Sequence, residues 1–340
     1  MDAAAELEPL VLELRRVALQ AGGFLLRFVS LLFGASVVAF VLVNLSPVDP
    51  VQQYVLASGG NVGAEQREAI AAHWGVGEPP VQRYFHWLNA LLHGDLGTSL
   101  FYRQPVIQVI KERFANTLVL MITSWLLAGV IGYVAGVAMG LWRGSWFDRV
   151  FKRICLVLAS IPTFWLGMLL LMVFAAMLGW FPIGFSSPVG VVSGDVTLGA
   201  RLHHLVLPAL TLALVSFSPI ALHTRQKMVD VMQSEYVTFS RSRGDSTWDI
   251  VRRHGIRNTL LPAMTLQFAS FGELFGGSIL AETVFSYPGL GSAVATAGLN
   301  SDVPLLLAIT LFATAFVFIG NQTANYLYKV VDPRIREAHG

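Results

Sequence analysis

The segment EYVTFSRSRGDSTWDIVRRHGIRNTLLP, from Glu235 to Pro262, is a polar and basic stretch between two long apolar segments. Because those neighbours are apolar enough to lie in a membrane, the stretch itself must lie in water on one side of the bilayer. Gly244 tolerates a positive φ and Ser246 can cap a helix, so we expect two short helices hinged at Gly244. The second helix, from Ser246 to about Arg257, would carry an amphipathic face suited to a partner's groove. The apolar residues of this face are Trp248, Ile250, Val251 and Ile256.

The composition of the whole chain supports membrane embedding. Of its 340 residues 54% are hydrophobic and 13% are charged, and the mean hydropathy is +0.61. So few charged side chains cannot cover the surface of a water-soluble globule of this size. The net charge of +2 and the absence of a basic run of five residues give no indication of nucleic-acid binding. Cys155 is the only cysteine, which excludes a disulfide framework.

Six segments of the sequence are each long and apolar enough to cross a bilayer, which takes roughly twenty residues of helix. They lie near 24–46, 116–141, 153–179, 205–224, 262–284 and 304–328. Prolines and glycines inside them are tolerated because neighbouring helices can satisfy the freed backbone groups. Gly132, Gly136 and Gly140 recur every four residues, which favours close packing of another helix of the same chain. The chain is therefore predicted to be an all-α polytopic membrane protein with about six transmembrane helices.

The distribution of lysine and arginine predicts the orientation in the membrane. These residues gather before the first span, between spans two and three, between four and five, and after the sixth. By contrast, segment 180–204 holds one arginine, and 285–303 holds neither residue. Both termini and the loop at 229–258 are therefore predicted to be cytoplasmic. Residues 1–22 would form an amphipathic extension on the cytoplasmic surface, or an unordered extension, ahead of a transmembrane domain at 23–340.

The loop at 47–113 is too long for a simple connection and would lie on the outer face. It contains helical patches at 65–74 and 81–92 and a glycine-rich segment at 93–100. We expect a small folded cap there, which is a natural place for a partner protein to land.

No catalytic group of residues is predicted. A phosphate-binding loop needs Gly-Lys before Ser or Thr, and none of the four lysines follows a glycine. The chain has no HExxH motif, and His203 and His204 have no partner at a spacing that would complete a metal site. We therefore expect structural histidines, and no enzymatic activity, metal site or cofactor in this chain.

Two glutamates, Glu273 and Glu282, fall in or near the fifth predicted span. A carboxylate at bilayer depth is costly and normally faces the bundle interior or a wet path. One hypothesis places Glu273, Gly276 and Gly277 along a translocation path that favours a cationic solute. The alternative for Glu273 is a buried carboxylate hydrogen-bonded to a neighbouring helix. For Glu282, near the outer end of the span, a structural role is favoured.

Several short motifs lie in order along the chain from about Arg27 to Arg336. They are Ser46–Pro50, His93–Gly97, Arg143–Asp148, Ile161–Trp165, His204–Pro208, Glu282–Gly291 and Asp332–Arg336. The opening stretch adds Glu235-Tyr-Val, Arg241-Ser-Arg-Gly244, His254-Gly-Ile-Arg-Asn258 and Leu261-Pro262. This stretch resembles the cytoplasmic "EAA" loop of bacterial ABC importer permeases, and the whole set resembles the first permease of dipeptide, oligopeptide and nickel importers. One departure is Ser240-Arg-Ser-Arg-Gly244, where the family usually has Ala-Arg-Ala-Lys-Gly.

The resemblance implies a type I ABC importer permease in the bacterial inner membrane. It implies a second homologous permease, two subunits that bind ATP and Mg and dock on the cytoplasmic loops, and an extracytoplasmic solute-binding protein. The helix at 235–243 would be the coupling helix, Gly244 its hinge, and Asn258 and Pro262 would begin the fifth span. The residues implied in ATPase coupling are Glu235, Tyr236, Arg241, Gly244, Arg257, Asn258 and Pro262. ATP binding by the partners would then switch the spans between inward- and outward-open states.

The residues leave more than one solute open. The run Gly272-Glu273-Leu-Phe-Gly276-Gly277 is more similar to nickel-type than to peptide-type permeases, and a membrane carboxylate suits a cation. The first hypothesis is therefore import of nickel or another transition metal, as the ion or a chelate. The alternative is import of di- or oligopeptides, whose amino terminus the same carboxylate could meet. A remote alternative is a stand-alone secondary transporter or channel, which the lack of detectable inverted-repeat symmetry disfavours.

Overall fold

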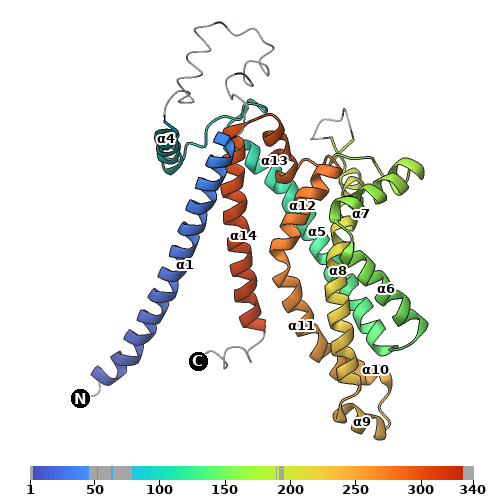
Figure 1. Cartoon of the computed structure of the whole chain (residues 1–340). Helices are drawn as coiled ribbons and strands as arrows, with labels where there is room; N and C mark the ends of the chain where they lie inside the picture. The colour runs from blue at the N-terminus through green and yellow to red at the C-terminus, as the bar shows by residue number, and fades with distance from the viewer. Residues whose placement is uncertain are drawn as a thin grey trace. The chain divides into compact units, whose positions relative to one another are not determined.

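The computed structural model describes residues 3–45, 79–188, 190 and 195–331, together with the single positions 52 and 63. Within these ranges the chain is built of helices, with one isolated β-bridge between Thr98 and Pro105. The helices labelled in Figure 1 are α1 (Ala3–Leu45), α4 (Pro80–Leu92), α5 (Val106–Leu141), α6 (Trp146–Ser160), α7 (Thr163–Leu170), α8 (Leu198–Met232), α9 (Glu235–Ser242), α10 (Thr247–Ile250), α11 (Ile256–Ala269), α12 (Phe271–Val284), α13 (Leu290–Leu299) and α14 (Val303–Val331). Two π-helical segments, Leu171–Met177 and Val251–Gly255, continue α7 and α10. The predicted all-α fold is confirmed.

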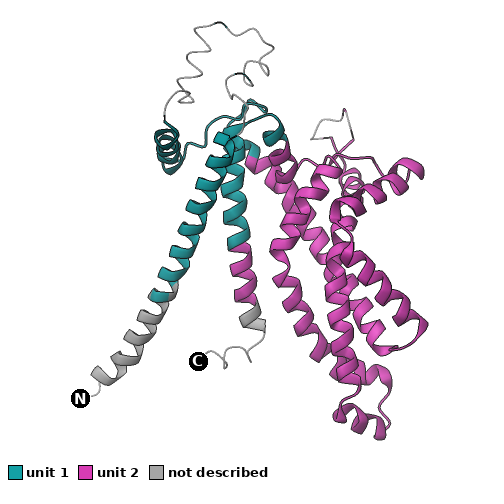
Figure 2. Cartoon of the chain, viewed as in Figure 1, with its two compact units in different colours: residues 1–109, 296–318 teal, residues 110–295, 319–340 magenta. Residues whose placement is uncertain are grey.

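The chain divides into two compact units, coloured separately in Figure 2. Unit 1 comprises residues 1–109 and 296–318, and unit 2 comprises residues 110–295 and 319–340. The polar stretch at 235–262 and the two glutamates near the fifth predicted span all belong to unit 2.

Four helices of the described chain are long and apolar enough to cross a membrane, and a fifth candidate is a pair of helices bent by 111°. The four are Ala21–Leu45, Val106–Leu141, Leu198–Met232 and Val303–Leu327, and the bent pair is Trp146–Ser160 with Thr163–Met177. The candidate span at 153–179 therefore corresponds to a helix pair with a sharp bend, and whether the pair crosses the membrane as one span stays a prediction. A proline disfavours the helical region for the residue before it, and Ile161, which precedes Pro162, is extended with φ −86° and ψ 129°. Helix α6 accordingly ends at Ser160, and a new helix starts after the proline.

The predicted span at 262–284 corresponds to α11 and α12, which are 14 residues each and are interrupted at Ser270. Ser270 has φ −81° and ψ 5°, outside the helical range, and its hydroxyl donates to the Gln267 carbonyl over 3.0 Å. The total of six spans and the cytoplasmic side of both termini stay predictions.

Unit 1 contains part of the segment predicted to form an outer cap. Helix α4 confirms the helical patch predicted at 81–92, whereas the patch at 65–74 lies outside the described residues. Tyr84 of α4 is held on α1 by a 2.7 Å hydrogen bond between its hydroxyl and that of Ser36. In the same unit the buried Asp302 caps the first turn of α14, accepting from the Leu305 N–H over 3.3 Å, and also accepts from the Ser99 hydroxyl. The glycine-rich segment thus forms an ordered turn against the start of a long helix.

The predicted extension at 1–22 is continuous with the first span. Helix α1 runs unbroken from Ala3 to Leu45, 43 residues in all, so the boundary at residue 22 does not coincide with a helix end. Its position on the cytoplasmic surface stays a prediction.

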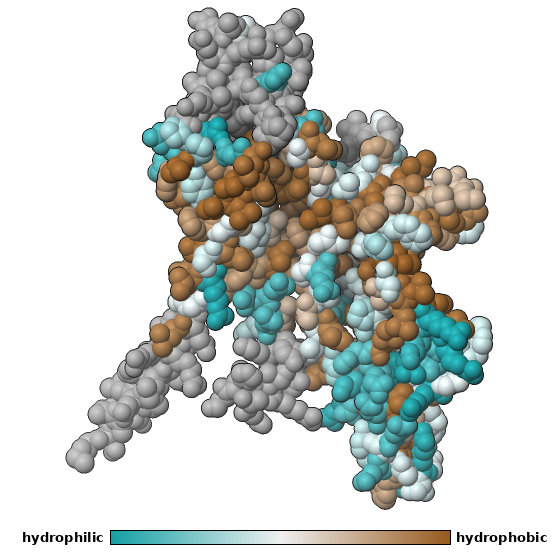
Figure 3. Space-filling view, in the orientation of Figure 1, coloured by the Kyte–Doolittle hydropathy of each residue, from teal (hydrophilic) through white to brown (hydrophobic). Residues whose placement is uncertain are grey.

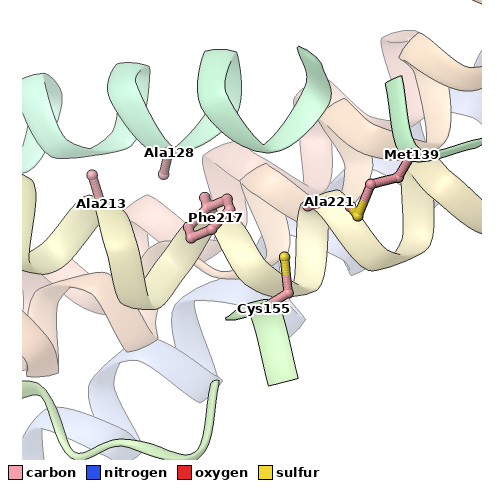
Figure 4. Packing of buried hydrophobic residues seen from close by; sticks show 6 residues of the cluster. All are labelled: Ala128, Met139, Cys155, Ala213, Phe217 and Ala221. Carbon is pink, nitrogen blue, oxygen red and sulfur yellow. The ribbon is translucent and has the colours of Figure 1, made fainter. Parts of the chain in front are cut away.

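The core of unit 2 is formed by α5, α6 and α8, as the close-up in Figure 4 shows. Ala128 and Met139 of α5, Cys155 of α6, and Ala213, Phe217 and Ala221 of α8 are buried together. The glycines at every fourth position of α5 explain this close approach. A Cβ at Gly132, Gly136 or Gly140 would lie 2.9, 2.6 and 2.5 Å from atoms of α8. The prediction that this stripe serves packing within the chain is confirmed.

Candidate functional site

The polar loop (residues 229–258) lies at one end of unit 2, where hydrophilic side chains gather around α9 and α10 in Figure 3. Helix α9 is held against the end of α8 by a small apolar cluster. Val237 of α9 is fully buried against Val231 of α8 and Ile250 of α10, and Met232 packs beside them. The loop is therefore a folded structure fixed on the end of a long helix.

Gly244 ends the turn after α9 with φ +89°, a conformation that side chains with a Cβ adopt at a cost. Its N–H donates to the Arg241 carbonyl over 3.0 Å, and the next N–H, of Asp245, donates to the Ser240 carbonyl over 3.2 Å. These bonds satisfy carbonyls that the end of α9 would otherwise leave free. The predicted positive φ is confirmed, and a hinge motion at Gly244 stays a prediction.

Ser246 caps the second helix, as the sequence predicts. Its hydroxyl oxygen accepts from the Asp249 N–H over 3.2 Å, and the hydroxyl donates to the Asp249 carboxylate over 2.5 Å. That hydrogen bond, with nearby Arg253 and Arg252 contributing less, lowers the pKa of the Asp249 carboxyl. A reciprocal cap of this kind fixes where α10 begins.

The second helix differs from the prediction in extent and in orientation. It does not end near Arg257, because α10 continues through the π-helical segment Val251–Gly255 into α11. Of the apolar face predicted for a partner, Ile250 and Val251 are buried inside this chain at 1% and 3% exposure. Ile250 is buried in the apolar cluster with Val231 of α8 and Val237 of α9, because burying apolar side chains within the chain is favourable.

Three aromatic side chains of the polar loop remain exposed, and we call them the aromatic patch. Tyr236, Phe239 and Trp248 are 44%, 64% and 68% exposed. The Tyr236 ring is tilted against the His254 ring at 5.3 Å, and the Arg243 guanidinium lies 6.0 Å from the centre of the Phe239 ring. Exposed aromatic side chains held in fixed positions are typical anchors of protein interfaces. Sequence reasoning named Trp248 and Tyr236 but missed Phe239.

The other residues implied in coupling lie on the surface of the same loop. Glu235 opens α9 and Arg241 lies in its last turn, and both are exposed. Arg257 and Asn258 are exposed in the first turn of α11, where the Asn258 amide donates to a carbonyl one turn earlier over 2.7 Å. Pro262 lies inside α11, so the helix begins before it, and its place at the start of the fifth span stays a prediction. The preceding π-helical segment makes the helix start earlier, and the proline removes only one backbone donor.

Glu273 lies in the first turn of α12 and lines an open groove of about 360 Å³ within unit 2. The other lining residues are Phe268, Ala269, Gly272, Asn321, Ala324 and Asn325. Asn321 and Asn325, which sequence reasoning missed, come from the last turns of α14. Of the glycines predicted beside Glu273, Gly276 has open space around it. A Cβ at Gly277 would lie 3.2 Å from a Leu212 methyl, so that glycine serves packing against α8.

Glu282 is a buried acceptor that joins three segments of unit 2. Its carboxylate accepts from the Thr117 hydroxyl over 2.7 Å and from the N–H groups of Gly291 and Ser292 over 2.6 and 3.3 Å. The Thr117 oxygen in turn accepts from the Leu290 N–H over 2.8 Å. These bonds tie α5, α12 and the start of α13 together, which supports the structural role favoured for Glu282.

The histidine pair also has structural contacts. A ring nitrogen of His203 lies 2.9 Å from the Trp180 carbonyl, and one of His204 lies 2.8 Å from the Gly184 carbonyl. Both therefore hold the segment after the bent helix pair against α8. No group of three or more His, Cys, Asp or Glu side chains suited to a metal ion occurs among the described residues.

The chain belongs to the family of binding-protein-dependent transport system inner membrane components, whose pattern matches residues 132–337. It is 33% identical over 308 residues to the oligopeptide transport system permease protein AppB of Bacillus subtilis (strain 168), covering 90% of this chain and 96% of the relative. It is 36% identical over 314 residues to the glutathione transport system permease protein GsiC of Escherichia coli (strain K12), covering 92% and 97%.

The fold has a solved counterpart in inward-facing conformations of the MetNI methionine ABC transporter. The TM-score is 0.52 at 16% identity, over 67% of this chain and 98% of that chain, which supports the fold alone. The expected type I importer permease fold and the resemblance to the dipeptide and oligopeptide permeases are thus confirmed. The chain is a permease subunit of an ABC importer and a multi-pass protein of the bacterial inner membrane.

Proposed function

We propose that this chain imports short peptides as one of two homologous permeases, driven by ATP hydrolysis on partner subunits. The observation that carries this proposal is the pair of relatives, which match at least 90% of the chain. One is named for oligopeptide transport and the other for glutathione, which is itself a tripeptide. These names favour the peptide alternative over the first hypothesis, import of nickel or another metal, which has no specific support.

The chemistry of the Glu273 groove supports the same choice. The polar side chains among its described lining residues are one carboxylate and two carboxamides, and none of these lining residues is a histidine or cysteine. Nickel and similar transition metals favour nitrogen and sulfur ligands over this set of oxygen donors. A peptide carries an ammonium group and amide groups, which pair naturally with a carboxylate and carboxamides.

The polar loop is the proposed docking site for an ATP-binding subunit. The aromatic patch would insert into a groove of that subunit, with Glu235, Arg241, Arg257 and Asn258 as a polar rim. Side chains of α9 and α10 are buried together with the end of α8. A movement of the docked partner would therefore displace the end of α8 as well as the polar loop. ATP and Mg would be bound by the partners, and an extracytoplasmic binding protein would deliver the solute.

The test is the ATPase activity of the purified complex with its binding protein, titrated with a mixture of short peptides and with Ni²⁺ or its chelates. We expect stimulation by peptides alone. Stimulation by metal alone would restore the metal hypothesis. Transport that continues during ATP depletion, with the ion gradients clamped, would instead identify a secondary transporter.

A further inference from the structure

The groove beside Glu273 combines polar side chains of α12 and α14, one carboxylate and two carboxamides, which together suit a cationic group with several N–H donors. Resting on the proposed function, we propose that it recognises the free α-ammonium group of the transported peptide. Glu273 provides the opposite charge, and Asn321 and Asn325 provide amide acceptors. N-blocked peptides would then be poor solutes at the permease itself.

Among the described residues that line the groove, Glu273 carries the charge. The other six described lining residues are uncharged, so none of them neutralises the carboxylate. Glu273, Asn321 and Asn325 are all exposed to the groove, and none has a hydrogen-bond partner among the described residues. Among the described residues, the Glu273 carboxylate therefore has no counter-charge in the groove and is available to a cationic group of a solute.

Glu273, Asn321 and Asn325 are polar side chains on otherwise apolar helices, where they are favourable only next to water or a polar solute. Asn321 and Asn325 lie in the apolar segment Val303–Leu327, one turn apart and hence on one face of α14. Carboxylates and carboxamides at that depth are unfavourable against lipid. We infer that the face carrying them borders the aqueous cavity through which the solute passes.

Neighbouring contacts fix the groove on both sides. A Cβ at Gly320 would lie 2.1 Å from the ring of Phe271, so the glycine lets the start of α12 lie directly against α14 beside Asn321. On the other side, Gln267 and Trp125 exchange two hydrogen bonds, of 2.7 and 3.1 Å, that fix the end of α11 on α5. The interruption at Ser270 lies between these two contacts. The carboxylate and the carboxamides are thus held by packed elements, as a recognition site requires.

An α-ammonium group matches the acceptors in number as well as in charge. It has three N–H donors, and the groove offers carboxylate oxygens and two amide oxygens. A charge-assisted hydrogen bond to a carboxylate is about twice as strong as a neutral one. Glu273 would therefore contribute most to the preference for free over N-blocked peptides. The small residues Ala269, Gly272 and Ala324 leave room beside it for peptides of different side chains, which Phe268 can contact.

The experiment compares uptake of a library of di- to hexapeptides in free and N-acetylated form, by the complete complex with its binding protein in proteoliposomes at pH 7. Imported peptides are identified by mass spectrometry. The binding protein imposes the same preference on every variant, so a change in the ratio of free to acetylated uptake reports on the permease. We expect Glu273→Gln to lower that ratio about tenfold, the equivalent of about 1.4 kcal/mol. Glu273→Asp, which keeps the charge, should give a ratio between those of the wild type and Glu273→Gln.

Thr283→Ala serves as a matched control, because Thr283 is exposed on the same helix but outside the groove. It should keep the wild-type ratio, and gel filtration of each complex checks that assembly is intact. A wild-type complex that imports peptides while Glu273→Gln keeps the same ratio would overturn the ammonium site and leave peptide import standing. A wild-type complex that imports no peptide would overturn the proposed function itself, and the site with it.

Discussion

The packing of α5 on α8 makes a strong prediction for Gly136→Ala. The added methyl would lie 2.6 Å from the Ala221 carbonyl oxygen and 2.6 Å from the Thr224 Cβ, about 0.8 Å closer than the 3.4 Å at which ordinary contact begins. Neither atom is the free end of a flexible side chain. The two helices must therefore separate locally, because no rotamer change can relieve the contact.

The cost follows from the two contacts. Overpacking in a well-packed interior costs about 1–3 kcal/mol, and a clash with a backbone oxygen belongs in the upper half of that range. Each kcal/mol lowers the melting temperature of a protein of this size by roughly 2–4 °C. We therefore expect Gly136→Ala to lower the melting temperature by about 4–12 °C.

The chain contains its own reporter for this measurement. Cys155, the only cysteine, is fully buried in the same core cluster as Ala221. A thiol-reactive dye that fluoresces on coupling would therefore report the opening of α5, α6 and α8 during a thermal ramp in detergent. Gly276→Ala is the matched control, since its Cβ would meet no atom within 4 Å and alanine raises helix propensity. It should melt at or slightly above the wild-type temperature.

An unchanged melting temperature and unchanged Cys155 protection in Gly136→Ala would refute the packing account of the glycine stripe. The same conclusion would follow if the control lost as much stability as Gly136→Ala, because the effect would then reflect the loss of glycine rather than the contact with α8.

Three further predictions concern two polar contacts and one backbone turn of unit 2. Arg225→Lys should destabilise the subunit by about 2–4 kcal/mol in the same dye assay, because Arg225 makes two parallel bonds to the buried Asp148 that a lysine cannot reproduce. Glu282→Ala should cost about 2–4 kcal/mol by leaving several buried donors without an acceptor, and equal stability of this variant and the wild type would contradict the joining role. Gly244→Ala should strain the loop by about 1–2 kcal/mol at φ +89°. The strain should appear as faster hydrogen exchange in α9 and as weaker stimulation of the ATPase by peptides. Unaltered hydrogen exchange would argue against the need for a positive φ at residue 244.

Local signals in the sequence predicted local structure well. Gly244 and Ser246 have backbone roles that follow from the residue itself, one through the missing Cβ and the other through a hydroxyl placed before a helix. The stripe of glycines on α5 predicted a close helix contact, because a spacing of four residues places them on one face. In each case the signal lies in the residue type itself or in its spacing along one helix.

Features that depend on competition between surfaces could not be predicted. Ile250 and Trp248 are two residues apart, and hydrophobicity alone assigned both to a partner's groove. The structure buries the first at 1% exposure and leaves the second 68% exposed, because the end of α8 covers only one side of α10. In the same way, Asn321 and Asn325 gave no signal in the sequence, since their meaning depends on a carboxylate about fifty residues earlier in the chain.

The path of the chain from the polar loop to the groove explains how one can act on the other. From Thr247 the backbone stays helical through Val251–Gly255 to Ala269, with no loop between. At 1.5 Å per residue this rod spans roughly 30 Å and ends at Phe268 and Ala269, which line the groove. If the proposed partner docks on the polar loop and displaces α10, we expect the displacement to pass along this helix, with rotation absorbed at Gly244 at one end and Ser270 at the other. Because Glu273 lies on α12 just after Ser270 and Asn321 lies on α14, we expect a rotation at Ser270 to alter the spacing of the proposed ammonium acceptors. The position of the polar loop would thus control binding and release of the solute, while the groove residues that contact the solute stay the same.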